Sequence, residues 1–394
     1  MQIWLSFIVS IILIMMISKK CLWLAFFTGA LFLGAVNLPY RDLYSITHYT
    51  ITDQNIILLA SAVGIIPLIG GGLKISGLMD DMINNLQVKR RVYLGLSPAI
   101  MGLLPIPGGA LLSAPMLHKS GDDIKPESYT VINIWFRHIL ILIYPLGALL
   151  PCSKMGNFNV YQAMLYIFPI FIILFFIGYY FFLRPIKGDM PKPYKLNIKK
   201  LLIPILIILS APVIHTLLTL TPLIDEAALV LAVSLSLAFT FLFGNLKIGE
   251  LLPLIKKMKP WRYFLIILGI FLFLRIFQAT TVADKISQLT FSQNFLIIVI
   301  AGILSFLTGR VQLAMSILIP IFLTKFGVDH FTILAFVIMY ISVYLGYMVS
   351  PVHPCVVISV EYFKTSYWKF AKKAFLPTII GFVLLYILSL IFVN

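Results

Sequence analysis

The sequence predicts an all-α protein that crosses a membrane many times, and its composition is the first indication. Of its 394 residues, 61% are hydrophobic and only 11% are charged, whereas a soluble domain carries about 25% charged residues. An ordinary soluble enzyme and a disordered chain are therefore excluded. The net charge of +16 is explained by lysines and arginines gathering in cytoplasmic loops. We therefore expect a lipid bilayer, and no nucleic acid, as partner.

The second indication is a series of apolar runs, each close to the ~20 residues that cross a bilayer. The first run lacks the basic start and the small-residue cleavage site of a signal peptide, so we interpret it as a retained span. The runs cover residues 3–17, 21–38, 54–72, 130–150, 160–183, 200–220, 225–243, 261–281, 331–349 and 372–392.

Two further apolar segments, 98–117 and 294–324, are interrupted by proline, glycine and polar residues. The first turns at Pro107-Gly108-Gly109 and the second at Thr308-Gly309-Arg310. Both are too short to cross the bilayer twice. We predict a re-entrant hairpin for each, because protein or water can cover non-helical backbone at membrane depth. A single proline-kinked span is the alternative in both cases.

The basic residues predict the orientation. With the N-terminus outside and each hairpin returning to its own side, most of the 30 lysines and arginines face the cytoplasm. Only Arg137, Arg275 and Arg310 lie within apolar segments. The sequence thus predicts a multi-pass protein of the cell inner (plasma) membrane with both termini outside.

The order of segments predicts two inverted repeats. Residues 1–183 form the first, 184–199 form a cytoplasmic linker, and 200–394 form the second. Each repeat has three spans, a hairpin, a broken span and a final span. Since each crosses the membrane an odd number of times, the second is inverted relative to the first.

The broken spans are expected at about 130–153 and about 331–363. Tyr144-Pro145-Leu146-Gly147 interrupts the first, and Ser350-Pro351-Val352-His353-Pro354 interrupts the second. Proline removes a backbone donor and leaves carbonyl groups free for a ligand or an ion. Inverted repeats with discontinuous helices are the architecture of secondary transporters.

Several motifs resemble a known family. They are GLSPAIMGLLPIPGGALLSAP (95–115), NIWFRH (133–138), SFLTG (305–309) and SPVHPCVVISVEYF (350–363). The chain resembles, over nearly its whole length, the prokaryotic membrane family of domain of unknown function 401. That family is grouped with the ion-transporter superfamily, which includes gluconate permeases and citrate, arsenite and sodium–dicarboxylate transporters. The resemblance implies an elevator-type scaffold and a homodimer. The Ser-Asn-Thr hairpin signature of the sodium–dicarboxylate branch is absent here.

Two arginines are the candidate anion anchors. Arg310 at the tip of the second hairpin needs a partner or an aqueous cavity, because a charge inside the membrane is costly. It either binds an anionic substrate through bidentate hydrogen bonds or pairs with an acidic residue or helix-end carbonyls. Arg137 shares a helical face with Asn133. It is either a second anchor or snorkels to the cytoplasmic face.

His353, with His138 as a weaker candidate, could couple transport to protons, since a histidine can titrate near neutral pH. The alternative is a structural histidine that caps the broken helix. The other candidate substrate-binding residues offer small side chains, hydroxyls or amides around the hairpins and breaks. They are Thr308, Gly309, Pro107, Gly108, Gly109, Ser113, Asn133 and Ser350.

The leading hypothesis is secondary active transport of a small, carboxylate-like organic anion, coupled to protons rather than to sodium. A cation/proton antiporter is the alternative within transporters, although it usually needs an acidic residue at the midplane. An intramembrane enzyme or a structural membrane protein is the alternative from another class. The scattered Cys21, Cys152 and Cys355 show no disulfide or zinc spacing, so we expect no metal site and no cofactor.

Overall fold

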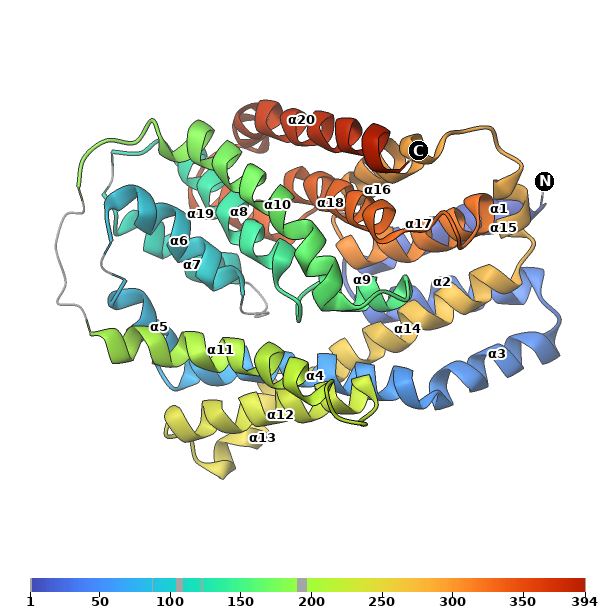
Figure 1. The fold of residues 1–394 in the computed structure, drawn as a ribbon, viewed down its shortest axis with the longest axis horizontal. Coiled ribbons are helices and arrows are strands. Elements are labelled where there is room, and N and C mark those ends of the chain that lie inside the picture. The colour runs from blue at the N-terminus through green and yellow to red at the C-terminus, as the bar shows by residue number, and fades with distance from the viewer. Residues whose placement is uncertain (1, 87, 104–108, 122, 190–196, 394) are drawn as a thin grey trace.

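A computed structural model describes residues 2–86, 88–103, 109–121, 123–189 and 197–393, and every regular element in these ranges is a helix. The helices are arranged as two bundles. Most helices of the first lie in the lower part of Figure 1 and those of the second in the upper part, while residues 2–18 and 282–287 of the first also lie in the upper part. Both halves of the chain contribute to both bundles, so neither bundle corresponds to a continuous half of the sequence.

The first bundle is built around α4 and α14, which pack against each other. Helix α12 covers α4, while α2 lies against α14. Its helices are α1 (Gln2–Ser18), α2 (Leu22–Asn37), α3 (Tyr40–Thr52), α4 (Gln54–Ile75), α5 (Leu78–Asn84), α11 (Ile198–Leu218), α12 (Asp225–Phe243), α13 (Leu251–Met258, after a 3-10 turn at Ile248–Glu250), α14 (Pro260–Ala279) and α15 (Val282–Ser287).

The second bundle is built around α8 and α18. Helix α8 packs on α6, α7 and α10, and α18 packs on α16 and α20. Its helices are α6 (Arg90–Gly102), α7 (Gly109–His118), α8 (Pro126–Ile143), α9 (Leu149–Met155), α10 (Val160–Gly178, continued by a π-helical turn at Tyr179–Leu183), α16 (Ala301–Thr308, after a π-helical segment at Phe295–Ile300), α17 (Val311–Phe326), α18 (Ile333–Val349), α19 (Pro354–Tyr362) and α20 (Tyr367–Phe392).

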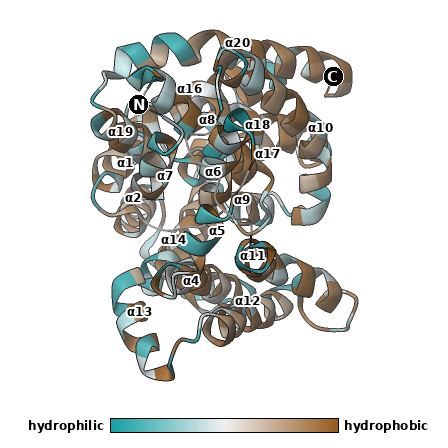
Figure 2. Cartoon of the chain, turned by 90° about the vertical axis from the view of Figure 1, so that its left-hand side faces the viewer, coloured by the Kyte–Doolittle hydropathy of each residue, from teal (hydrophilic) through white to brown (hydrophobic). Residues whose placement is uncertain are grey.

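Seven helical segments of the described chain are long and apolar enough to cross a membrane, and shorter apolar helices accompany them. Hydrophobic residues cover α10 and α20 (Figure 2), and many of these side chains are exposed, including Phe176 and Ile391. Lipid is the environment that such surfaces fit. The chain is therefore an all-helical, multi-pass membrane protein, as the sequence predicts.

Each of the two interrupted segments forms a pair of helices in contact. The first pair is α6 and α7, and the second is α16 and α17. The second pair turns at Gly309, whose φ of +60° suits glycine. A Cβ atom there would lie 2.9 Å from Cγ2 of Val352. Pro107 and Gly108 lie outside the described residues. Re-entry into the membrane and the inverted repeat stay predictions.

The two breaks follow from the restriction that proline places on the residue before it. Tyr144, Ser350 and His353 each precede a proline and have ψ angles of 115°, 132° and 121°, far from helical values. Helix α8 therefore ends at Ile143, and α18 ends at Val349. Pro354 then starts α19, since a proline fits the first turn of a helix.

An ion pair joins the start of α4 to α14 in the first bundle. Asp53 caps α4 by accepting hydrogen bonds from the amides of Asn55 and Ile56. Its Oδ2 also accepts a 2.6 Å hydrogen bond from Arg275 of α14, whose guanidinium lies over the ring of Tyr49. Burial alone would raise the pKa of Asp53, but the hydrogen bonds from Arg275 and the two amides lower it overall.

We predict that Asp53→Asn lowers the free energy of unfolding by about 1–3 kcal/mol, because it removes the charge that caps the helix and pairs with Arg275. Since folding depresses the pKa of Asp53, its contribution is complete above the unfolded value of 3.8 and is lost as the pH falls through the folded value. Thermal unfolding in detergent at several pH values measures this.

The exposed Asp42 of α3 provides the control, since Asp42→Asn should leave the stability unchanged. A stability difference between the wild type and Asp53→Asn that stays constant at acidic pH would contradict the assigned ion pair.

Candidate functional site

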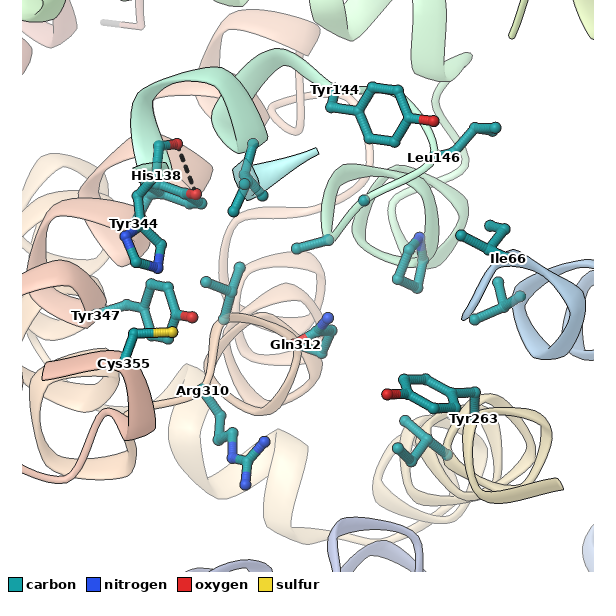
Figure 3. Close-up of a pocket in the computed structure, with 18 of the residues that line it drawn as sticks. Ile66, His138, Tyr144, Leu146, Tyr263, Arg310, Gln312, Tyr344, Tyr347 and Cys355 are labelled. Atoms are coloured by element: carbon teal, nitrogen blue, oxygen red, sulfur yellow. Dashed lines mark hydrogen bonds between the residues drawn. The ribbon is translucent and has the colours of Figure 1, made fainter. Parts of the chain in front are cut away.

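A cavity of ≈ 350 Å³ lies where the two bundles meet (Figure 3). The first bundle contributes residues of α2, α4 and α14, and the second contributes both helix breaks, the end of α6 and the turn before α17. The lining residues used below are Arg137, His138, Tyr144, Tyr263, Gly309, Arg310, Gln312, Tyr344, Tyr347, His353 and Cys355. The cavity therefore gathers the segments that the sequence singled out, although they lie far apart along the chain.

Arg137 is buried inside the second bundle, with 4% of its surface exposed. It points from α8 to the start of α7, where its Nη1 donates to the Gly109 carbonyl at 2.9 Å and to Ser113 Oγ at 3.5 Å. Its Nε has no hydrogen-bond partner among the described residues. The guanidinium thus lies in the protein interior beside the cavity, and its role as an anion anchor stays a prediction.

Gly109 is required for this position of the Arg137 guanidinium, because a Cβ atom at residue 109 would lie only 2.1 Å from Nη2 of Arg137. Gly102 at the end of α6 allows a close approach to the backbone of α8. A Cβ atom there would lie 2.1 Å from the Arg137 carbonyl oxygen. Two glycines therefore let α6 and α7 approach α8 closely enough to enclose the arginine.

Arg310 stands directly before α17 and also borders the cavity. Its side chain points away from His138 and Cys355 (Figure 3). Its Nη2 lies 3.5 Å from the Ser18 carbonyl at the end of α1, a weak contact with a helix-end acceptor. Within the described residues it forms no ion pair with a carboxylate. Its guanidinium therefore retains donors for another partner.

The lining of the cavity carries positive charge without negative charge. Arg137 and Arg310 both line it, and its described lining includes no aspartate or glutamate. Gln312 and the hydroxyl groups of Tyr144 and Tyr263 add polar atoms on other sides. The arrangement is that of a mostly apolar pocket with a few polar groups, as small-molecule sites have.

The two histidines of the cavity lie close together, with ring centroids 4.7 Å apart. His138 donates through Nδ1 to the Ile134 carbonyl at 2.6 Å, since a carbonyl oxygen can only accept. Its own carbonyl accepts a 2.8 Å hydrogen bond from Tyr344 (Figure 3). His353 is fully buried, and the ring of Tyr347 lies 3.9 Å from it. Neither ring nitrogen of His353 has a hydrogen-bond partner within the described residues.

Asn133, Ser113, Thr308 and Ser350 are not among the described residues that line the cavity. Asn133 donates to Ser359 Oγ of α19 at 3.0 Å, and its Oδ1 has no partner among the described residues. Ser350 donates to the Phe306 carbonyl at 2.6 Å and so ties the second break to α16. Ser113 and Thr308 donate to carbonyls of their own helices. The contacts of these three hydroxyls are structural, whereas Gly309 does line the cavity.

Residues 2–392 match the family model described as Protein of unknown function (DUF401). The chain belongs to the DUF401 family. No curated protein matches it. The family match confirms the resemblance seen in the sequence motifs and leaves its superfamily placement as a prediction.

Sequence reasoning missed part of this DUF401 site. Tyr263 belongs to α14, and its only sequence signal is a polar group near the start of an apolar run. Gln312 has a clearer signal, because it is a polar residue two positions after Arg310 in the predicted second hairpin. Cys355 follows the second break directly, but the three cysteines show no disulfide or zinc spacing, so the sequence predicts no role for it.

A polar network also joins the two bundles of this DUF401 protein away from the cavity. Lys154 of α9 contacts Asp225 Oδ2 at 2.6 Å and Glu226 Oε1 at 2.5 Å, both at the start of α12. His215 of α11 lies 3.3 Å from Asp225 Oδ1, and the Tyr161 hydroxyl contacts His215 Nδ1 at 2.7 Å. These groups connect α9 and α10 of the second bundle to α11 and α12 of the first.

We predict that Gly109→Ala destabilises the protein by about 1–3 kcal/mol, because the added methyl group displaces the Arg137 guanidinium from its seat. Gly249→Ala is the matched control, since a Cβ atom there meets nothing within 4 Å. Thermal unfolding of both variants measures the difference.

A double-mutant cycle tests the cause. In an Arg137→Ala background the cost of Gly109→Ala should shrink, because the clashing group is gone. An equal loss of unfolding free energy in both backgrounds would contradict the close packing of Arg137 against Gly109.

Proposed function

We propose that this protein is a secondary active transporter of a small organic anion of the carboxylate class. The observation that carries the proposal is the cavity between the bundles, which Arg137 and Arg310 line and to which no described acidic residue contributes. Two cationic side chains in an apolar interior favour a bound anion, because an unpaired charge there is costly.

The donors of the two arginines fit this role. Nε of Arg137 has no hydrogen-bond partner in the described structure, and Arg310 has only one long contact, to Ser18. A carboxylate accepts two parallel hydrogen bonds from a guanidinium group, so it matches these donors in charge and shape. The hydroxyl group of Tyr263 offers a further hydrogen bond to an organic anion across the cavity, whereas the Tyr144 hydroxyl already donates to the Ile208 carbonyl.

Movement of one bundle against the other would give alternating access to the cavity. Transporters built from inverted repeats bind substrate between moving parts, near discontinuous helices. Here both breaks and both helix pairs belong to the second bundle, and α4 and α14 of the first bundle form the opposite wall. Our proposal is an elevator-type motion in which the second bundle carries the anion. Proton coupling, rather than sodium coupling, and a homodimeric assembly belong to the same proposal.

The cavity favours this function over its alternatives. A cation/proton antiporter usually needs an acidic side chain at the site, and the described lining has none. A catalytic or a purely structural role would produce no flux of solute, so a transport assay separates both from the proposal.

We predict that purified protein in liposomes accumulates a small carboxylate when a pH gradient is imposed, and that Arg310→Gln and Arg137→Gln each reduce the initial rate about tenfold or more. Loss of a charge-assisted bidentate contact costs on the order of 1.5–3 kcal/mol. The assay uses radiolabelled carboxylates of roughly two to six carbon atoms, which are small enough for a cavity of this size.

The exposed arginine of α3 provides the control, and Arg41→Gln should transport at the wild-type rate. Arg137→Lys keeps the charge and separates loss of an anion anchor from loss of folding, which the melting temperature of each variant monitors. Uptake that is unchanged by both glutamine variants would contradict the proposed anchors.

A further inference from the structure

We propose that His138, His353 and Cys355 form a binding site for a thiophilic d10 metal ion, Zn²⁺ or Cu⁺. Each of the three residues offers one ligand atom, and these atoms all lie within 4.8 Å of one another. His138 comes from α8 before the first break, and the other two come from the second break and the start of α19. The site thus joins the two broken helices, and it goes beyond the proposed transport function.

The separations suit a metal after a small inward movement. Metal–ligand bonds of about 2.0–2.3 Å place tetrahedral ligand atoms roughly 3.3–3.8 Å apart, so the side chains must close by about 1–1.5 Å. The two residues of the second break are well placed for this. His353 lies in the non-helical segment, and Cys355 is in the first turn of α19.

The hydrogen bonds of both histidines are those expected of metal ligands. His138 donates from Nδ1 to the Ile134 carbonyl, which leaves the Nε2 lone pair free. A metal-binding histidine almost always makes such a contact through its other nitrogen. The Met348 carbonyl lies near the His353 ring, but neither nitrogen forms a hydrogen bond of good geometry. A fully buried imidazole without partners is costly, and coordination to a metal would satisfy it.

The third ligand lies beside Arg137, whose guanidinium is next to the Cys355 thiol. The thiolate is the form that binds metals. Binding would release the thiol proton to solvent. The thiolate would cancel one charge of the metal ion.

The ligand set selects the class of ion. One thiolate and two imidazoles suit Zn²⁺ and Cu⁺, whereas Mg²⁺ and Ca²⁺ require oxygen ligands, which this cluster lacks. All three ligands border the cavity, so a fourth position on Zn²⁺ remains open to water or to an anion. Three protein ligands with one open position is the arrangement of reactive rather than purely structural zinc sites.

Metal binding to purified protein tests the site without any assay of transport. The apoprotein in detergent is titrated with Co²⁺, a spectroscopic substitute for Zn²⁺, in a buffer that contains no thiol reductant. We expect one ion per chain and a thiolate-to-cobalt charge-transfer band that Zn²⁺ abolishes. Cu⁺, supplied from a buffered chelator, is titrated in parallel. Cys355→Ser and His353→Ala should each weaken binding about tenfold or more.

Two variants outside the cluster are matched controls. Cys21→Ser removes another thiol, and His48→Ala removes an exposed imidazole of α3. Both should bind metal as the wild type does. Failure of the wild type to bind either Zn²⁺ or Cu⁺ would overturn the proposal, and so would binding that survives Cys355→Ser and His353→Ala. Because the readout is metal binding, these results do not depend on whether the protein transports an anion.

Discussion

The candidate site is organised around one guanidinium group, that of Arg137, which is enclosed within a bundle of apolar helices. A charge in this position is tolerated only with hydrogen-bond acceptors or an aqueous cavity beside it, and the protein provides both. The Gly109 carbonyl accepts from Nη1, and Arg137 also lines the cavity. Gly102 and Gly109 allow the close approach of α6 and α7, since a Cβ atom on either would clash with Arg137.

The helix breaks place the rest of the site around that arginine. Prolines end α8 at Ile143 and α18 at Val349, and the segment that follows each helix then turns beside the cavity. Ser350 fastens the second break to α16 through the Phe306 carbonyl, and the tight turn at Gly309 packs against Val352. Backbone breaks that would be unfavourable in lipid are thus enclosed between protein segments, where their polar groups can meet water or a ligand.

The sequence predicted the helical class, the membrane and the positions of these breaks, because apolar length and proline act locally. It also named four charged or titratable residues of the cavity, Arg137, His138, Arg310 and His353. It left open where Arg137 points, since snorkelling and burial differ only in the packing of α6 and α7. It could not reveal that Cys355 lies beside His138, nor that Lys154 meets Asp225 and Glu226. These contacts join residues from different halves of the chain, and no spacing along the sequence encodes them.

The central claim is that the cavity between the bundles is built for an anion. The most direct measurement is the melting temperature of the purified protein across a panel of small carboxylates, inorganic anions and organic cations. A ligand that binds the native state raises this temperature with its concentration. The account predicts stabilisation by at least one carboxylate, and loss of that effect in Arg310→Gln. Stabilisation by organic cations alone, with no response to any anion, would contradict it.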